Sequence, residues 1–174
     1  MKTVITVVAA AIVAAAVFAA QAPARAQQAP APGAWRTFEG TFSASGQHQA
    51  IPTESGQPAL PVQLSGAVAI TGGEGLSRGF RGEVIGFDDG SGVTVLRCVW
   101  TDAHGDRIFS QLKGESVASG HRIAGTIAGG TGRYAGITGD YSFEWQYVVE
   151  AEAGTLQGRA VGLRGRYRAG GADR

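Results

Sequence analysis

Apolar and polar positions alternate along this chain in short stretches separated by turn residues. The alternation is clearest around residue 144, where Tyr141, Phe143, Trp145 and Tyr147 hold the odd positions, so their rings share one face of a strand. No window after residue 33 sustains a helical period. The pattern predicts about eight strands, over residues 35–45, 60–70, 80–87, 93–101, 107–114, 122–128, 141–150 and 155–167.

The connections between these stretches are short and rich in glycine and aspartate, which favours antiparallel neighbours. Gly82, Gly125 and Gly158 fall inside predicted strands, where glycine is costly unless the strand must bend or coil tightly. The sequence therefore predicts an all-β fold, a small closed antiparallel barrel of about eight strands rather than a sandwich. The longest irregular segment, 46–58, is expected to form a flap across one mouth.

A glycine-rich run precedes the aromatic strand. It is predicted to be a tight structural turn, whose glycines provide positive φ angles or close backbone approach: Gly129, Gly130, Gly132, Gly136 and Gly139. This run, with Arg133 and Tyr134 inside it and the stretch 98–102 upstream, resembles the allene oxide cyclase and dirigent barrels, a calycin-like architecture. The resemblance implies a barrel that holds an apolar ligand and associates into dimers or trimers. No catalytic residue carries over, because no polar group of the family's cavity matches a position here.

A weaker similarity links the chain to the lipocalins. Their first strand opens with Gly-x-Trp, and an arginine of their last strand covers that tryptophan. Here Gly33 and Trp35 open the domain, and Arg164, Arg166 and Arg168 lie near its end. The alternative is a tryptophan that plugs the closed end of a barrel beneath an arginine stem, an arrangement that needs no ligand.

Residues 1–26 have the features of a signal peptide: Lys2, an apolar run from Val4 to Ala20, and the small-x-small pattern that ends at Ala26. An uncleaved membrane anchor is the alternative. Residues 27–33 are expected to form a flexible tether, and residues 34–170 the barrel domain. We therefore expect a periplasmic or secreted protein, cleaved near Ala26 and without stable membrane insertion afterwards.

The charge balance and the cysteine content limit the kinds of partner and of covalent cross-link that the chain can have. The chain has 15 Lys and Arg against 14 Asp and Glu, and removing Lys2 and Arg25 with the signal peptide leaves 13 against 14. Such balance gives no electrostatic attraction toward nucleic acid. Cys98 is the only cysteine, so no intrachain disulfide can form, and packing and sheet hydrogen bonds must stabilise the fold.

Several kinds of site lack support in the sequence. The spacing Gly130, Gly132, Ala135 matches a loose dinucleotide fingerprint, but no βαβ unit surrounds it, so a structural turn is favoured. The three histidines, His48, His104 and His121, are too far apart for a zinc motif. The sequence therefore predicts neither a metal nor a cofactor.

A calcium site and a cysteine nucleophile are two further possibilities that the sequence supports only weakly. Asp88, Asp89, Asp102 and Asp106 could gather a calcium ion at a barrel rim, but aspartate beside glycine is ordinary turn chemistry. Cys98 could act as a nucleophile if His104 or His121 folded onto it, whereas burial in a strand more often leaves a cysteine inert.

Two charges in apolar strands are the catalytic candidates. Arg97 shares a strand face with Val95 and Val99, and Glu144 lies between Phe143 and Trp145. Facing a cavity, Glu144 could act as a general acid or base and Arg97 could stabilise an enolate or bind a carboxylate. Facing outward, both would be solvated, or would form a cross-strand ion pair of little consequence.

The aromatic strand face must be buried, because four exposed rings are more apolar area than a monomer leaves in water. It lines a cavity if it faces inward and needs a partner subunit if it faces outward. The residues expected to contact a ligand are Cys98, Trp100, Tyr141, Phe143, Trp145 and Tyr147. We expect a barrel that binds an apolar or aromatic small molecule without a cofactor and forms homo-oligomers. The alternatives are a cofactor-free cyclase or isomerase, and a structural oligomer with a filled lumen.

Overall fold

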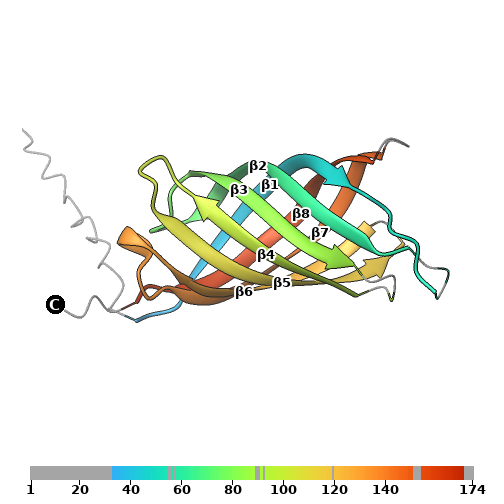
Figure 1. The fold of residues 1–174 in the computed structure, drawn as a ribbon. Helices are drawn as coiled ribbons and strands as arrows, with labels where there is room; N and C mark the ends of the chain where they lie inside the picture. The colour runs from blue at the N-terminus through green and yellow to red at the C-terminus, as the bar shows by residue number, and fades with distance from the viewer. Residues whose placement is uncertain are drawn as a thin grey trace, which may run out of the picture.

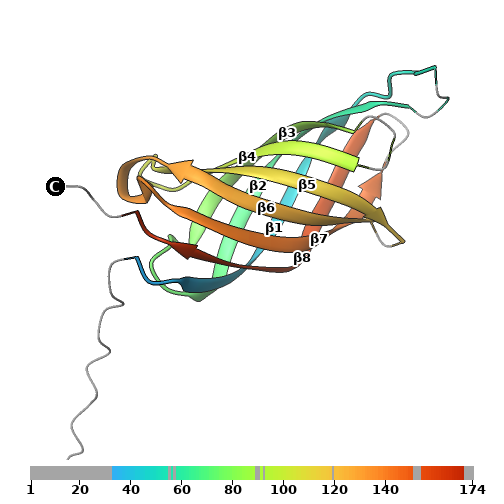
Figure 2. The ribbon, with the colours of Figure 1, turned by 90° about the horizontal axis from the view of Figure 1, so that it is seen from below.

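The computed structural model describes residues 33–54, 56, 58–88, 91, 93–118, 120–150 and 154–170, and within them the chain forms a closed barrel in which each strand pairs antiparallel with the next and β8 pairs with β1 (Figures 1 and 2). This confirms the predicted all-β antiparallel barrel. The strands are β1 (Arg36–His48), β2 (Leu60–Gly73), β3 (Gly79–Asp88), β4 (Val93–Thr101), β5 (Arg107–Val117), β6 (Gly120–Gly130), β7 (Thr138–Glu150) and β8 (Thr155–Arg168). In the described part of the chain, no helix has the length and apolar character needed to cross a membrane.

Every predicted strand corresponds to an observed one, because period-two alternation decides which side chains enter the barrel. In β4 the side chains of Thr94, Leu96, Cys98 and Trp100 are buried, whereas Arg97 between them is exposed. The observed strands are mostly longer than predicted, since pairing with both neighbours extends each ladder into glycine-containing ends that show no alternation.

The two ends of the barrel differ. The end that we call the closed end carries the β2–β3, β4–β5 and β6–β7 connections, and both limits of the described chain, residues 33 and 170, lie there. The other end, which we call the open end, carries the connections that follow β1, β3, β5 and β7. In Figure 1 the closed end is on the left.

Side chains fill the closed half of the barrel. Phe38, Val68, Ile108 and Ile137 are at most 1% exposed. The Phe38 ring lies 6.0 Å from Trp100 in an edge-to-face arrangement, measured between ring centroids. An interior packed this tightly is what an eight-stranded barrel permits when large side chains point inward.

The glycine run is a compact turn with a short 3-10 helix, η1 (Gly132–Tyr134). Gly132 has φ = 54°, and a Cβ at this position would collide with the Asp106 carboxylate, so the position requires glycine. Gly129 and Gly136 also have positive φ angles. Gly130 ends β6 and Gly139 belongs to β7, and both pack against neighbouring backbone. The prediction of a structural turn is confirmed, over a shorter span than proposed.

The β1–β2 connection is not the expected flap. Residues 46–48 belong to β1, and an isolated bridge between Ile51 and Ala59 continues the pairing past the ends of β1 and β2. In both views the connection extends beyond the open end instead of lying across it (Figures 1 and 2). Continued strand pairing directs this segment along the barrel axis.

Trp35 lies outside the barrel, where it is 51% exposed, so the predicted tryptophan plug is wrong. Its arginine cover does form. The guanidinium carbons of Arg166 and Arg168 lie 4.8 Å and 5.4 Å from the centroid of the indole ring. Arg166 also forms an ion pair with Asp140 at 3.0 Å, so the first and seventh strands are tied through the eighth.

Candidate functional site

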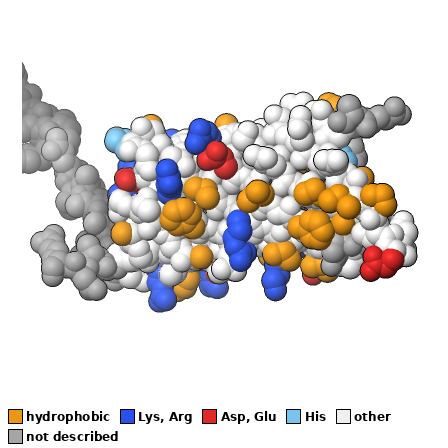
Figure 3. Space-filling view, viewed as in Figure 1, with side chains coloured by type: hydrophobic (Ala, Val, Ile, Leu, Met, Phe, Trp, Pro, Cys, Tyr) orange, Lys and Arg blue, Asp and Glu red, His pale blue; other side chains and the backbone are white. Residues whose placement is uncertain are grey.

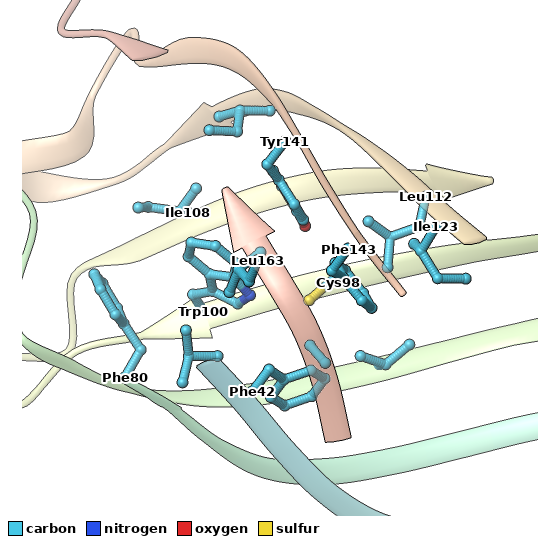
Figure 4. Close-up of a cluster of buried hydrophobic side chains, with 14 of the residues drawn as sticks. Phe42, Phe80, Cys98, Trp100, Ile108, Leu112, Ile123, Tyr141, Phe143 and Leu163 are labelled. Atoms are coloured by element: carbon cyan, nitrogen blue, oxygen red, sulfur yellow. The ribbon is translucent and has the colours of Figure 1, made fainter. Parts of the chain in front are cut away.

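The open half of the barrel contains a cavity of about 350 Å³ that reaches from the middle of the lumen to the mouth at the open end. This volume falls in the range of small-molecule pockets. Its wall is mainly apolar, with polar residues that include His48 and His121, and its apolar part draws on all eight strands through Phe42, Leu60, Val62, Leu64, Val84, Leu96, Leu112, Ile123, Phe143, Trp145, Leu156 and Leu163. Figure 4 shows part of this cluster converging on the lumen.

The aromatic strand face points into the barrel, which settles the orientation that the sequence left open. Tyr141, Phe143 and Trp145 are at most 9% exposed, and all of them line the cavity. Tyr147 lies at the mouth and is 37% exposed. The Trp145 ring occupies space that Gly158 of β8 leaves free, since a Cβ there would collide with the indole. Glycine in β8 thus makes room for a large ring in β7.

Tyr141, Trp100 and Cys98 form the floor of the cavity. The Trp100 and Tyr141 rings lie 5.1 Å apart, and both side chains lie beside the Cys98 thiol. Burial raises the pKa of the Cys98 thiol to about 12. The Tyr141 hydroxyl lies beside Cys98 and Ser110, yet it makes no hydrogen bond of normal geometry within the described chain. The floor therefore presents one unsatisfied polar group in apolar surroundings.

Polar side chains gather at the mouth. Thr94 donates a hydrogen bond of 2.8 Å to the Asp88 carboxylate. His121 lies 3.4 Å from the Ser116 hydroxyl through Nε2 and 3.3 Å from the Tyr147 hydroxyl through Nδ1. The entrance thus offers hydrogen-bonding groups, whereas the wall behind it offers apolar contact.

The two catalytic candidates face away from the cavity. Arg97 is exposed on the outer face of β4, and neither it nor Glu144 lines the cavity. Glu144 is half-buried on the outer side of β7, where it accepts a hydrogen bond of 3.2 Å from Gln146. The physical reason is alternation: with Cys98 and Phe143 pointing inward, their neighbours must point outward. The outward interpretation is correct for both charges.

The weaker pairings do not assemble. Cys98 lies in the lumen, whereas His104 belongs to the β4–β5 connection at the closed end and His121 to the mouth. Asp88 lies at the open end, away from Asp102 and Asp106. Throughout the described residues, no group of three or more histidine, cysteine, aspartate or glutamate side chains is placed to hold a metal ion.

A buried polar network at the closed end has no counterpart in the sequence predictions. The Asp102 carboxylate accepts hydrogen bonds from the backbone N–H groups of His104 (2.8 Å) and Asp106 (3.1 Å), from the Tyr134 hydroxyl (3.1 Å) and from the Arg133 guanidinium. Ser77 also hydrogen-bonds to this carboxylate at 3.4 Å.

The network decides the charge state of Asp102. Burial alone would raise the pKa of this carboxyl, but the hydrogen bonds from Arg133, Tyr134 and the backbone outweigh burial and hold the pKa well below its usual range. From the sequence, Asp102 is predicted only to be a turn residue, and Arg133 and Tyr134 are predicted only to belong to the glycine-rich turn. Nothing in the spacing of these residues indicates that two turns meet.

The site is thus a blind apolar pocket in a barrel, closed at one end by packed rings beneath an ion-paired cap. No family model, curated protein or solved structure matches this chain.

Proposed function

We propose that this protein binds an apolar or aromatic small molecule in the open half of the barrel. The observation that carries the proposal is the cavity of about 350 Å³, with its mainly apolar wall and its mouth at one end. A barrel whose role was purely structural would gain stability by filling this space with larger side chains. Burial of a ligand's apolar surface against the aromatic wall would supply the binding free energy.

The cyclase alternative has less support. Its named candidates, Arg97 and Glu144, lie outside the cavity, and the polar groups at the mouth do not converge with the floor on one reacting position. The relationship to the allene oxide cyclase and dirigent barrels stays a prediction, as does export to the periplasm. The proposed signal peptide, residues 1–26, and residues 27–32 of the proposed tether lie outside the described residues.

A fluorescence titration with N-phenyl-1-naphthylamine, an uncharged apolar probe, tests the proposal. We expect saturable binding by the native chain and a large loss of binding in Val84→Phe, which adds a ring to the cavity wall. The matched control is Ile85→Phe, since residue 85 is 62% exposed on the outer face of the same strand. Equal probe binding by the two variants, with both folded by circular dichroism, would contradict the proposal.

The predicted self-association also remains a proposal, on a different surface from the one expected. Ile85, Phe87, Val93 and Val95 of β3 and β4 are 46–62% exposed, and Phe87 pairs with Val95. Figure 3 shows hydrophobic side chains gathered on this face near the open end. Covering such a strip in a homo-oligomer would remove apolar area from water. Sedimentation of Phe87→Glu tests it: an unchanged mass relative to the native chain would contradict self-association through this face.

A further inference from the structure

We propose that the cavity accepts neutral, mainly apolar molecules that carry a hydrogen-bond-accepting oxygen at the end that enters first, and that the Tyr141 hydroxyl donates to this oxygen. The inference rests on the proposed binding function and specifies its ligand class. Such oxygens include those of ketones, ethers and alcohols.

The placement of the Tyr141 hydroxyl carries this inference. Tyr141 is 4% exposed, and its hydroxyl, which lies beside Cys98 and Ser110, makes no hydrogen bond of normal geometry in the described chain. The other deeply buried tyrosines are satisfied: Tyr134 donates to Asp102, and Tyr167 donates to the carbonyl of Glu74. Buried hydroxyls are normally paired because an unpaired one loses its hydrogen bonds to water without replacement. Tyr141 is therefore the exception that needs a partner.

The direction of the Tyr141 side chain says where that partner comes from. Tyr141 lines the cavity, and its hydroxyl points toward the space between Trp100, Phe143 and Cys98 (Figure 4). Burial raises the pKa of Tyr141 well above its usual range, and the neighbouring Cys98 thiol raises it further. The phenol thus keeps its proton at any physiological pH and can donate it in a hydrogen bond.

The lining also excludes a charged group at the floor. No lysine or arginine of the described chain lines the cavity, so a carboxylate or phosphate beside Tyr141 would be buried without a counter-charge. Asp88, the one carboxylate of the lining, lies at the mouth and already accepts a hydrogen bond from Thr94. A cation would therefore find its partner only at the entrance.

Three probes of nearly equal shape separate these requirements: 2-acetylnaphthalene carries the accepting oxygen, 2-ethylnaphthalene lacks it, and 2-naphthoate is charged. Dissociation constants would be measured for the native chain, for Tyr141→Phe and for Tyr167→Phe, a control that removes a tyrosine hydroxyl outside the cavity lining, at the closed end. We expect Tyr141→Phe to weaken 2-acetylnaphthalene binding about tenfold and to leave 2-ethylnaphthalene binding unchanged or tighter. Tyr167→Phe should change neither, and 2-naphthoate should bind the native chain most weakly.

Equal effects of Tyr141→Phe on the ketone and the hydrocarbon would overturn the inference and leave the binding function standing. Binding of 2-naphthoate as tight as that of the ketone would overturn the requirement for a neutral ligand. If neither uncharged naphthalene bound the native chain, the proposed function itself would fail. Infrared spectra of 2-acetylnaphthalene bound to the native chain give an independent measurement if Tyr141→Phe does not fold. A carbonyl stretch lowered from its value in hexane supports the hydrogen bond, and an unshifted stretch overturns it.

Discussion

The two ends of this barrel use similar strands for opposite purposes. At the closed end, Phe38 and Ile108 fill the lumen, and the network around Asp102 joins the β4–β5 and β6–β7 connections above them. At the open end the inward side chains leave a cavity, and His121 contacts the hydroxyls of Ser116 and Tyr147 at its mouth. The alternation of inward and outward residues is the same in both halves.

This difference shows that the connections contribute, together with strand side chains such as Phe38 and Ile108, to filling one half of the barrel. The β6–β7 connection turns back over the lumen and brings Tyr134 and Ile137 into the core. The described part of the β1–β2 connection extends away from the barrel, although its Pro58 lines the cavity (Figure 1). The packed interior therefore lies at one end and the cavity at the other.

The largest expected effect is on the unfolding free energy, when the same substitution, phenylalanine to alanine, is made in each half of the barrel. Phe38→Ala should cost about 4 kcal/mol of unfolding free energy, because the ring is enclosed by Trp100, Tyr141 and Tyr167. Phe143→Ala should cost about 2 kcal/mol, since the Phe143 ring already borders a cavity and has fewer contacts to lose. Urea unfolding of both variants measures the difference. Equal costs would mean that the two halves are equally well packed.

Asp102→Asn should destabilise the protein by about 3 kcal/mol near neutral pH, because the side chain is fully buried and Arg133 loses its charged partner. The folded pKa of Asp102 lies below its unfolded value, so this stabilisation is present above about pH 4 and is lost as the pH falls through the lowered folded pKa. Unfolding free energies of the native chain and the variant should therefore converge below about pH 4. If the difference in unfolding free energy between the native chain and the variant stayed constant down to pH 3, the charge of Asp102 would not be the source of the stabilisation.

Gly132→Val should cost about 2 kcal/mol, because a β-branched residue resists positive φ and its Cβ would displace Asp106. Gly79→Val is the control: residue 79 lies in a strand, and a Cβ there would have nothing within 4 Å. Thermal unfolding of both variants checks the prediction. If both melt at the native temperature, the turn does not hold the closed end together.

The smallest effect on stability is expected at Cys98, because its replacement by alanine removes little volume. The informative measurement there is the chemical reactivity of the thiol. Because burial raises its pKa to about 12, the Cys98 thiol of the native chain should react with iodoacetamide at pH 8 far more slowly than the same thiol in urea. Mass spectrometry after timed labelling gives both rates. Similar rates would show that the floor of the open half is accessible to solvent.

The sequence was sufficient for the strands and for the set of cavity-facing rings, because both depend on local alternation. Two sets of residues predicted from the sequence, the catalytic candidates and the residues expected to contact a ligand, could not both face the lumen. Arg97 and Cys98 are adjacent, as are Glu144 and Trp145, so only one member of each pair could face the lumen. The alternation that selected the rings already excluded the charges.

The closed-end network and the choice of the filled end could not be predicted in the same way. Asp102 and Arg133 are 31 positions apart, and they meet only because β5 and β6 pair over their whole length. Nothing local indicates which set of connections turns inward. The unsatisfied Tyr141 hydroxyl is equally invisible in the sequence, because it depends on what surrounding strands fail to provide.

The position of residues 33 and 170 has a practical consequence. Both lie at the closed end, on the side opposite the cavity mouth (Figures 1 and 2). A barrel attached to a bead, a sensor surface or a fused protein through either of these positions therefore presents its mouth to the surrounding solution, so that the attachment leaves the entrance of the cavity unobstructed.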